Sequence, residues 1–234
     1  MDDSRTLYAG SSTRTAERVS AFLTKVYGWM FVGLGITAAV AYLVASSPAL
    51  TTALTENRLI FFALVLVELG LVFFLSARVH SLEPGTAAGL FVGYAALNGV
   101  TLSLILLIYT GASIAMTFVV TGAMFGALAV YGTTTSRSLA GAGQFFFMGL
   151  IGIVLASIVG MFWQSSGLQF VISFIGVIVF TGLAAYDAQR LKAMALAMPE
   201  GETGSYAIVG ALALYLDFIN LFLFLLRFIG NRRD

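Results

Sequence analysis

Long apolar stretches, separated by short polar segments, make up most of the chain. Val26–Thr55 carries no charge, and Leu59–Ala77 is interrupted by one carboxylate, Glu68. Gly85–Ser136 and Ser138–Tyr186 are also uncharged, and each is long enough for two membrane crossings. An α-helix needs about 20 apolar residues to cross a bilayer. Together with a last apolar stretch near the C-terminus, the pattern predicts an all-α integral membrane protein with seven transmembrane helices.

Turn-forming residues place the ends of these helices. The first helix is predicted to end near Ala45, and breaks at 109–113 and 163–167 divide the two longest stretches. The sixth helix is predicted to reach Asp187 and to be followed by a polar loop containing Arg190, Lys192, Pro199, Glu200 and Glu202. The seventh covers Tyr206–Phe228. The resulting domains are a polar N-terminal tail (1–24, of which 1–20 is expected to be flexible or at the surface), a transmembrane domain (25–230) and a short C-terminal tail (231–234).

Composition supports the membrane assignment and removes several kinds of chemistry. Charged residues make up 10% of the chain and hydrophobic ones 59%, with a mean hydropathy of +0.97, whereas soluble domains carry about 25% charge. No cysteine is present, so disulfides and thiolate metal sites are excluded. The single histidine, His80, falls in a predicted loop. No nucleotide-binding loop is recognisable, and we expect no cofactor, no permanently bound metal and no nucleic-acid partner.

The positive charges predict an orientation. With seven crossings and a cytoplasmic N-terminus, most of the 12 Lys and Arg residues fall on the inside, where they are enriched in membrane proteins. The C-terminus then lies on the opposite, outer side of the membrane. The inside set is Arg5, Arg14, Arg18, Lys25, Arg78, Arg137, Arg190 and Lys192.

Glycine spacing predicts where helices pack closely. Gly89 and Gly93, and likewise Gly122 and Gly126, form small-xxx-small pairs. Such pairs let neighbouring helix backbones approach one another in membranes. We therefore expect these two faces to be helix–helix contacts.

Carboxylates inside the predicted spans are the candidate functional groups. Asp217 lies near the middle of the last helix, on one stripe with Gly210, Ala213 and Asn220. Ionisable groups at that depth face a protein interior or a wet cavity. If Asp187 lies beside it, the two carboxyls share a proton, because like charges in a site of low dielectric cannot both ionise cheaply. Such a pair is a candidate proton switch.

Each of these residues also has a structural interpretation. Asp187 can be a solvated helix end paired with Arg190 one turn on, and Asp217 can be a hydrogen-bonding hub. Glu68 can face a cavity or the surface. Arg78 can be an ordinary positive-inside anchor.

Three segments resemble one family. They are Leu214–Phe222 (LYLDFINLF), Ala185–Asp187 (AYD) and Tyr94–Gly99 (YAALNG). They are similar to the Bax inhibitor (transmembrane Bax inhibitor motif) family, in particular its bacterial, YccA-like inner-membrane branch. The resemblance runs from about residue 25 to residue 233.

The resemblance implies a fold and a function. It implies seven helices with the last one at the centre of the other six, and a pH-sensitive calcium leak gated by an aspartate pair. The pair carries over to Asp187 and Asp217, which would bind calcium transiently, and the family's latch arginine carries over to Arg78. It also implies modulation of a membrane-bound AAA protease in bacterial relatives.

The sequence therefore supports three functional hypotheses. The first is a pH-sensitive calcium (cation) leak channel of the inner membrane, in which Glu68, Asn98 and Asn220 line the cavity and no reaction is catalysed. The second is a non-conducting regulator of a AAA protease, which would act through the polar N-terminal tail. The third is an intramembrane aspartyl protease, since two aspartates on neighbouring helices are its minimum. Against it, Asp217 follows Leu-Tyr-Leu and not Gly-x-Gly.

Overall fold

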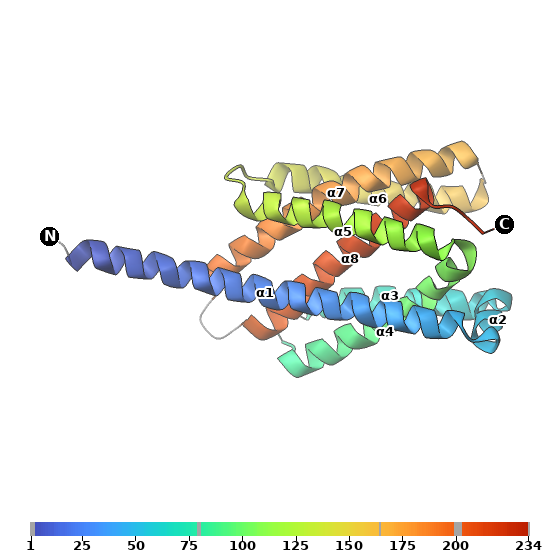
Figure 1. The fold of residues 1–234 in the computed structure, drawn as a ribbon, viewed down its shortest axis with the longest axis horizontal. Coiled ribbons are helices and arrows are strands. Elements are labelled where there is room, and N and C mark those ends of the chain that lie inside the picture. Colours follow the sequence, from blue (N-terminus) through green and yellow to red (C-terminus); the bar gives the residue numbers. More distant parts are fainter. Residues whose placement is uncertain (1–2, 79–80, 164, 199–202, 234) are drawn as a thin grey trace.

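The chain folds into a bundle of helices running back and forth along one axis (Figure 1). The computed structural model describes residues 3–78, 81–163, 165–198 and 203–233. His80, Pro199, Glu200 and Glu202, for which the sequence predicted loops, lie outside these residues. The helices are α1 (Asp3–Ala45), α2 (Pro48–Glu56), α3 (Arg58–Ala77), α4 (Pro84–Ile108), α5 (Gly111–Thr134), α6 (Ala140–Phe162), α7 (Ser166–Ala197) and α8 (Thr203–Ile229).

Seven of these helices are long and apolar enough to cross a membrane, which confirms the predicted fold class. Local chemistry sets several of their starts. The side chain of Asn57 accepts hydrogen bonds from the first backbone N–H groups of α3, and Thr110 and Ser165 cap α5 and α7 in the same way. Such caps satisfy N–H groups that have no partner within the helix. The two ends of the chain lie at opposite ends of the bundle (Figure 1), as an odd number of spans requires.

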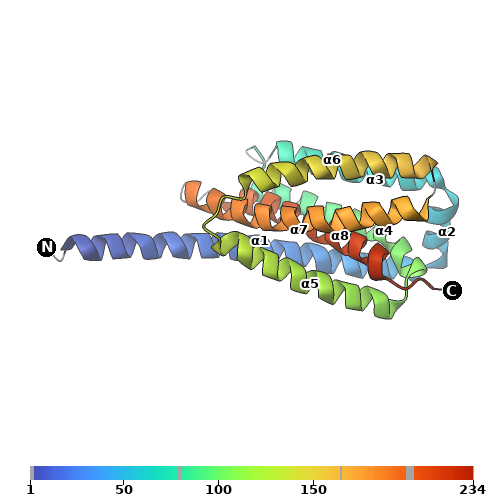
Figure 2. The ribbon, with the colours of Figure 1, turned by 90° about the horizontal axis from the view of Figure 1, so that it is seen from above.

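The structure departs from the predicted element boundaries in three places. The short helix α2 was not predicted. The helix α1 begins at Asp3 and extends beyond the other helices (Figure 2). The N-terminal segment is therefore helical, and residues 14–18 lie at the surface, as one of the two alternatives predicted. Phe22, within the predicted tail, is buried, and the Arg18 guanidinium donates to the Met198 carbonyl oxygen over 2.8 Å. The bundle therefore begins before residue 25.

The third departure concerns the helix that carries Asp187. This helix, α7, does not end there but continues to Ala197. Ala188, Leu191 and Ala195 recur at helical spacing and are buried, so this polar-looking segment is amphipathic. Asp187 therefore lies inside a helix, ten residues before its end.

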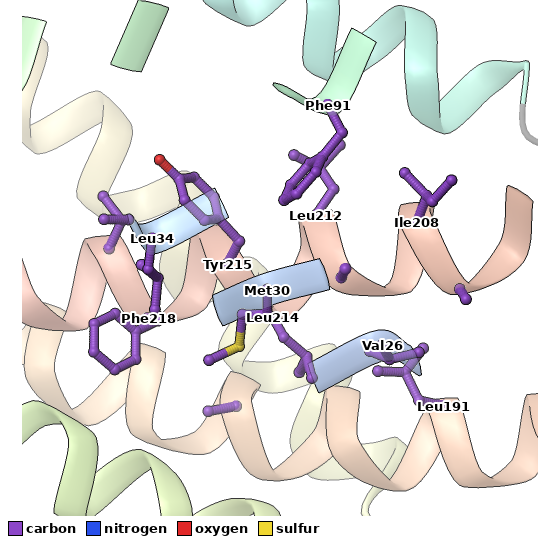
Figure 3. Packing of buried hydrophobic residues seen from close by; sticks show 14 of the residues in the cluster. Val26, Met30, Leu34, Phe91, Leu191, Ile208, Leu212, Leu214, Tyr215 and Phe218 are labelled. Atoms are coloured by element: carbon purple, nitrogen blue, oxygen red, sulfur yellow. The ribbon is translucent and has the colours of Figure 1, made fainter. Parts of the chain in front are cut away.

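The last helix, α8, is the most buried of the seven. Within its most apolar window 72% of residues are buried, against 44% or less in the other spans. It packs against α1, α4, α5 and α7, and its residues Ile208, Leu212 and Tyr215 meet side chains of α1, α4 and α7 (Figure 3). A position at the centre of all six other spans is not confirmed, because α6 packs mainly on α7.

The glycines that lie at close helix–helix contacts are not the predicted ones. A Cβ added at Gly89, Gly93, Gly122 or Gly126 would meet no atom within 4 Å, so the prediction that these pairs form helix contacts was wrong. Gly99 of α4 instead faces the Thr37 carbonyl oxygen of α1, and an added Cβ would lie 2.7 Å from it. The spacing of small residues does not say which helix face meets a neighbour.

We expect Gly99→Ala to destabilise the bundle, because the added methyl group overlaps backbone of α1. Overpacking of this kind costs about 1–3 kcal/mol. Gly93→Ala is the matched control on the same helix, where the methyl group enters open space and alanine is the better helix former. Thermal unfolding in detergent should show a lower Tm for Gly99→Ala alone. Equal Tm values for the two variants would contradict the close α1–α4 contact.

Candidate functional site

The two predicted aspartates meet at the interface between α7 and α8. A short connection makes these helices antiparallel neighbours. Asp187 precedes the end of α7 by ten residues and Asp217 follows the start of α8 by fourteen, which is about 15 Å and about 21 Å of helix. The two side chains therefore reach a similar level, and their carboxyl groups lie close enough to hydrogen-bond to each other.

A hydrogen bond between two carboxyl groups needs a proton. Carboxylates only accept, so one of the two groups must be a carboxylic acid that donates. Asp217 is 5% exposed, and its Oδ2 is buried with no hydrogen-bond partner among the described residues. A buried, unpartnered oxygen costs about 1–3 kcal/mol. This oxygen therefore stands out, since most buried polar groups are hydrogen-bonded.

A cavity of about 760 Å³ adjoins the pair. Its walls come from α6, α7 and α8, and α6 contributes mainly apolar side chains. Its polar wall residues are Gln144, Tyr186, Asp187, Arg190, Asp217 and Asn220. The pair thus faces a cavity that is lined partly by polar side chains.

Arg190 is the cation nearest to the pair in this cavity wall. It lies one turn after Asp187 on α7, and its charge acts on the Asp187 carboxyl. The sequence left open whether Asp187 faces Arg190 or Asp217. In the structure it faces both, so these two interpretations do not compete.

Arg78 does not meet the aspartates. It is exposed just after α3, its guanidinium lies over the Phe74 ring at 5.9 Å, and it does not line the cavity. The latch implied by the resemblance is therefore not formed through Arg78 in this conformation. From the sequence, Arg190 was expected only as the partner of Asp187 at a solvated helix end, because it falls in the predicted loop.

The three residues expected to line the cavity divide into two groups. Asn220 lines it, one turn after Asp217. Glu68 and Asn98 do not line it, although both are buried. Glu68 accepts a hydrogen bond from the Thr101 hydroxyl at 3.0 Å, and the Asn98 amide donates to the Tyr94 hydroxyl oxygen at 3.3 Å.

Tyr215 links this second polar group to α1. Its ring meets that of Tyr94 edge-on at 5.8 Å, and its hydroxyl shares a 2.6 Å hydrogen bond with the Thr37 hydroxyl. The Thr37 hydroxyl in turn donates to the Ala95 carbonyl oxygen at 2.9 Å. These contacts tie α1, α4 and α8 together. Glu68 and the amide nitrogen of Asn98 have partners on α4, whereas the Asn98 Oδ1 is buried with no hydrogen-bond partner among the described residues.

Tyr215→Phe should cost stability without changing ion chemistry. It removes one buried hydrogen bond and leaves Thr37 its Ala95 acceptor, so the loss is about 1 kcal/mol. Denaturation in detergent measures it. A loss of several kcal/mol would mean that the cluster depends on this hydroxyl far more than its contacts indicate.

Known proteins resemble the chain over most of its length. The family model described as "Inhibitor of apoptosis-promoting Bax1" (Bax1-I) matches residues 19–234. The inner membrane protein YbhL of Escherichia coli K12 is 51% identical over 92% of this chain and 93% of its own. The protein RP147 of Rickettsia prowazekii is 42% identical over 100% of both chains, and the membrane protein SpyM3_0260 of Streptococcus pyogenes is 37% identical over 94% and 96%. These matches agree with the resemblance of the three sequence segments, and with a helical bundle fit to cross a membrane. The chain belongs to the Bax inhibitor family of membrane proteins.

Proposed function

We propose that this protein is a pH-sensitive calcium leak of the bacterial inner membrane, gated by the proton that Asp187 and Asp217 share. The contact between the two carboxyl groups, at the wall of a cavity of about 760 Å³, is the observation that carries the proposal. Carboxylate and amide oxygens are the ligands that Ca²⁺ prefers. Two carboxyl groups supply fewer than the six to eight oxygens that Ca²⁺ takes, so the passing ion keeps part of its water shell.

The proton sets the charge of the cavity wall. While the carboxyls share it, the pair carries one negative charge, and Arg190 opposes that charge. When the proton leaves, two carboxylates repel each other and together attract a divalent cation. Ca²⁺ flux is therefore expected to rise as the pH rises and to fall on acidification.

Orientation follows from the positive charges. With the N-terminus cytoplasmic, Asp187 and Arg190 lie toward the cytoplasmic end of α7 and Arg232 lies at the periplasmic end. Cytoplasmic pH then reaches the pair through the cavity. The leak would sense the pH on the side toward which Ca²⁺ runs down its gradient.

The test is Ca²⁺ entry into vesicles that contain the purified protein, measured with a trapped fluorescent indicator between about pH 5 and about pH 8. Flux should depend on the protein and increase over this range. If vesicles with the protein take up no more Ca²⁺ than protein-free vesicles at every pH, the proposed leak is wrong.

An aspartyl protease remains the enzymatic alternative, because touching carboxyl groups that share a proton are also its chemistry. The chain lacks the Gly-x-Gly that precedes the aspartate in those enzymes, and its named relatives are membrane proteins without a stated activity. Incubation of the purified protein with transmembrane peptides tests it, and cleavage that is lost in Asp217→Asn would favour the enzyme. Regulation of a membrane-bound AAA protease through the N-terminal segment stays a prediction. Deletion of residues 1–20 tests it, because protease modulation should then be lost while any Ca²⁺ flux is kept.

A further inference from the structure

A second cavity, of about 780 Å³, adjoins the first. It lies between α4, α6, α7 and α8, toward the end of the bundle that holds the C-terminus, and Tyr109, Arg227 and Arg232 are among its wall residues. The two cavities have part of their walls in common. The shared residues are Leu150, Val154, Phe180 and Asn220.

Asn220 differs from the other three shared residues because it is polar. Its Nδ2 donates to the Leu216 carbonyl oxygen at 2.8 Å, which fixes the orientation of the amide. Its Oδ1 has no hydrogen-bond partner within the part of the chain that the structure describes. Asn220 follows Asp217 by one turn on the same face of α8. It therefore offers one fixed, free amide oxygen at the junction of the two cavities.

Wall charge changes at this junction. Asp187, Asp217 and Arg190 line the first cavity, whereas the wall of the second holds Arg227 and Arg232 and, among the described residues, no carboxylate. A cation that leaves the aspartates toward the second cavity passes three apolar side chains and then two guanidinium groups. Among apolar side chains a cation needs oxygen ligands to replace lost water, and Asn220 is the one polar residue of the four that both cavities share.

We propose that the two cavities are halves of one passage along α8, and that Asn220 determines which cations cross between them. This inference rests on the proposed leak for its cation, but the passage itself can be tested without any flux. An amide oxygen at the junction of the two cavities favours hard cations such as Ca²⁺. A carboxylate there would favour divalent ions further, and an apolar side chain would close the passage to ions.

The passage is tested by single cysteines, which the chain makes simple because it has none of its own. Asn220→Cys should react with a small cationic, membrane-impermeant thiol reagent added to either face of oriented vesicles. Ala213→Cys, in the first cavity wall, should react from one face, and Leu223→Cys, in the second, from the other. Leu214→Cys, fully buried, is the unreactive control. Reaction of Asn220→Cys from one face alone, or from neither, overturns the passage.

Selectivity is tested by flux through vesicles. Asn220→Leu should lower Ca²⁺ flux at least tenfold at all pH values, and Asn220→Asp should raise the preference for Ca²⁺ over K⁺. Asn98→Leu, which removes a buried amide outside both cavities, is the matched control, and Asn220→Ala replaces the leucine variant if that one does not fold. Wild-type flux that responds to pH, together with undiminished flux in Asn220→Leu, overturns the role of Asn220 and leaves the leak intact. Absence of wild-type flux overturns both the leak and the cation role, and the cysteine result then decides on the passage alone.

Discussion

Asp217→Asn should give a Ca²⁺ flux that no longer responds to pH. The amide has nearly the shape of the carboxyl group and still donates a hydrogen bond to Asp187, but it has no proton to release. Asp187 then keeps a permanent donor at its side, and the pair cannot switch between one negative charge and two. Flux measured between about pH 5 and about pH 8 should vary severalfold in the wild type and be flat in the variant.

The matched control for this prediction is Glu56→Gln, which neutralises an exposed carboxylate at the end of α2, far along the chain from the pair. Its pH profile should equal that of the wild type. An unchanged pH profile in Asp217→Asn would show that another group senses pH. Both variants must elute as folded protein in detergent for the comparison to count.

Arg190→Gln should move the pH profile of the flux toward higher pH. Arg190 lies one helical turn after Asp187, and a nearby cation favours the ionised form of a carboxyl group, so we expect the pair to hold its proton more firmly without it. A nearby opposite charge is worth about one pH unit or more, and the partial exposure of Arg190 reduces this, so we expect a shift of about one unit in the pH of half-maximal flux.

Arg137→Gln and Arg78→Gln are the controls for this shift. Both remove an exposed cation that lies outside the cavity wall. Neither should move the profile. A shift in Arg78→Gln as large as that in Arg190→Gln would restore Arg78 as the latch and imply a second conformation in which α3 moves toward the pair.

The sequence predicted the spans well because their signal is strong. Charge-free stretches longer than a bilayer crossing have few alternatives, and the break before Ser166 and the end of the first helix at Ala45 were placed correctly. The boundaries failed where polar residues were taken as loops. The segment after Asp187 carries Arg190 and Lys192, yet its apolar residues recur on one face, and the Lys192 ammonium donates to the Thr133 carbonyl oxygen at 2.6 Å.

The candidate site, too, could be predicted from the sequence only in part. Asp187 and Asp217 were recognisable because carboxylates inside apolar helices are rare, and their sequence distance fits two antiparallel neighbours. The placement of Arg78, Glu68 and Asn98 was not recognisable, because it depends on which faces of α3 and α4 turn toward α8. The same holds for the glycines, since Gly99 and Gly93 look alike in the sequence and only one meets another helix.

The central claim is that one proton, held between Asp187 and Asp217, controls the flux. Infrared difference spectroscopy of the reconstituted protein observes that proton directly, through the C=O stretch of a protonated carboxyl group as the pH is raised. We expect the wild type to lose the C=O signal of one protonated carboxyl group over the same pH range in which its Ca²⁺ flux rises. This loss should be absent in Asp187→Asn. A flux that rises while the carboxyl signal stays constant, or the same pH-dependent loss of signal in Asp187→Asn, would contradict it.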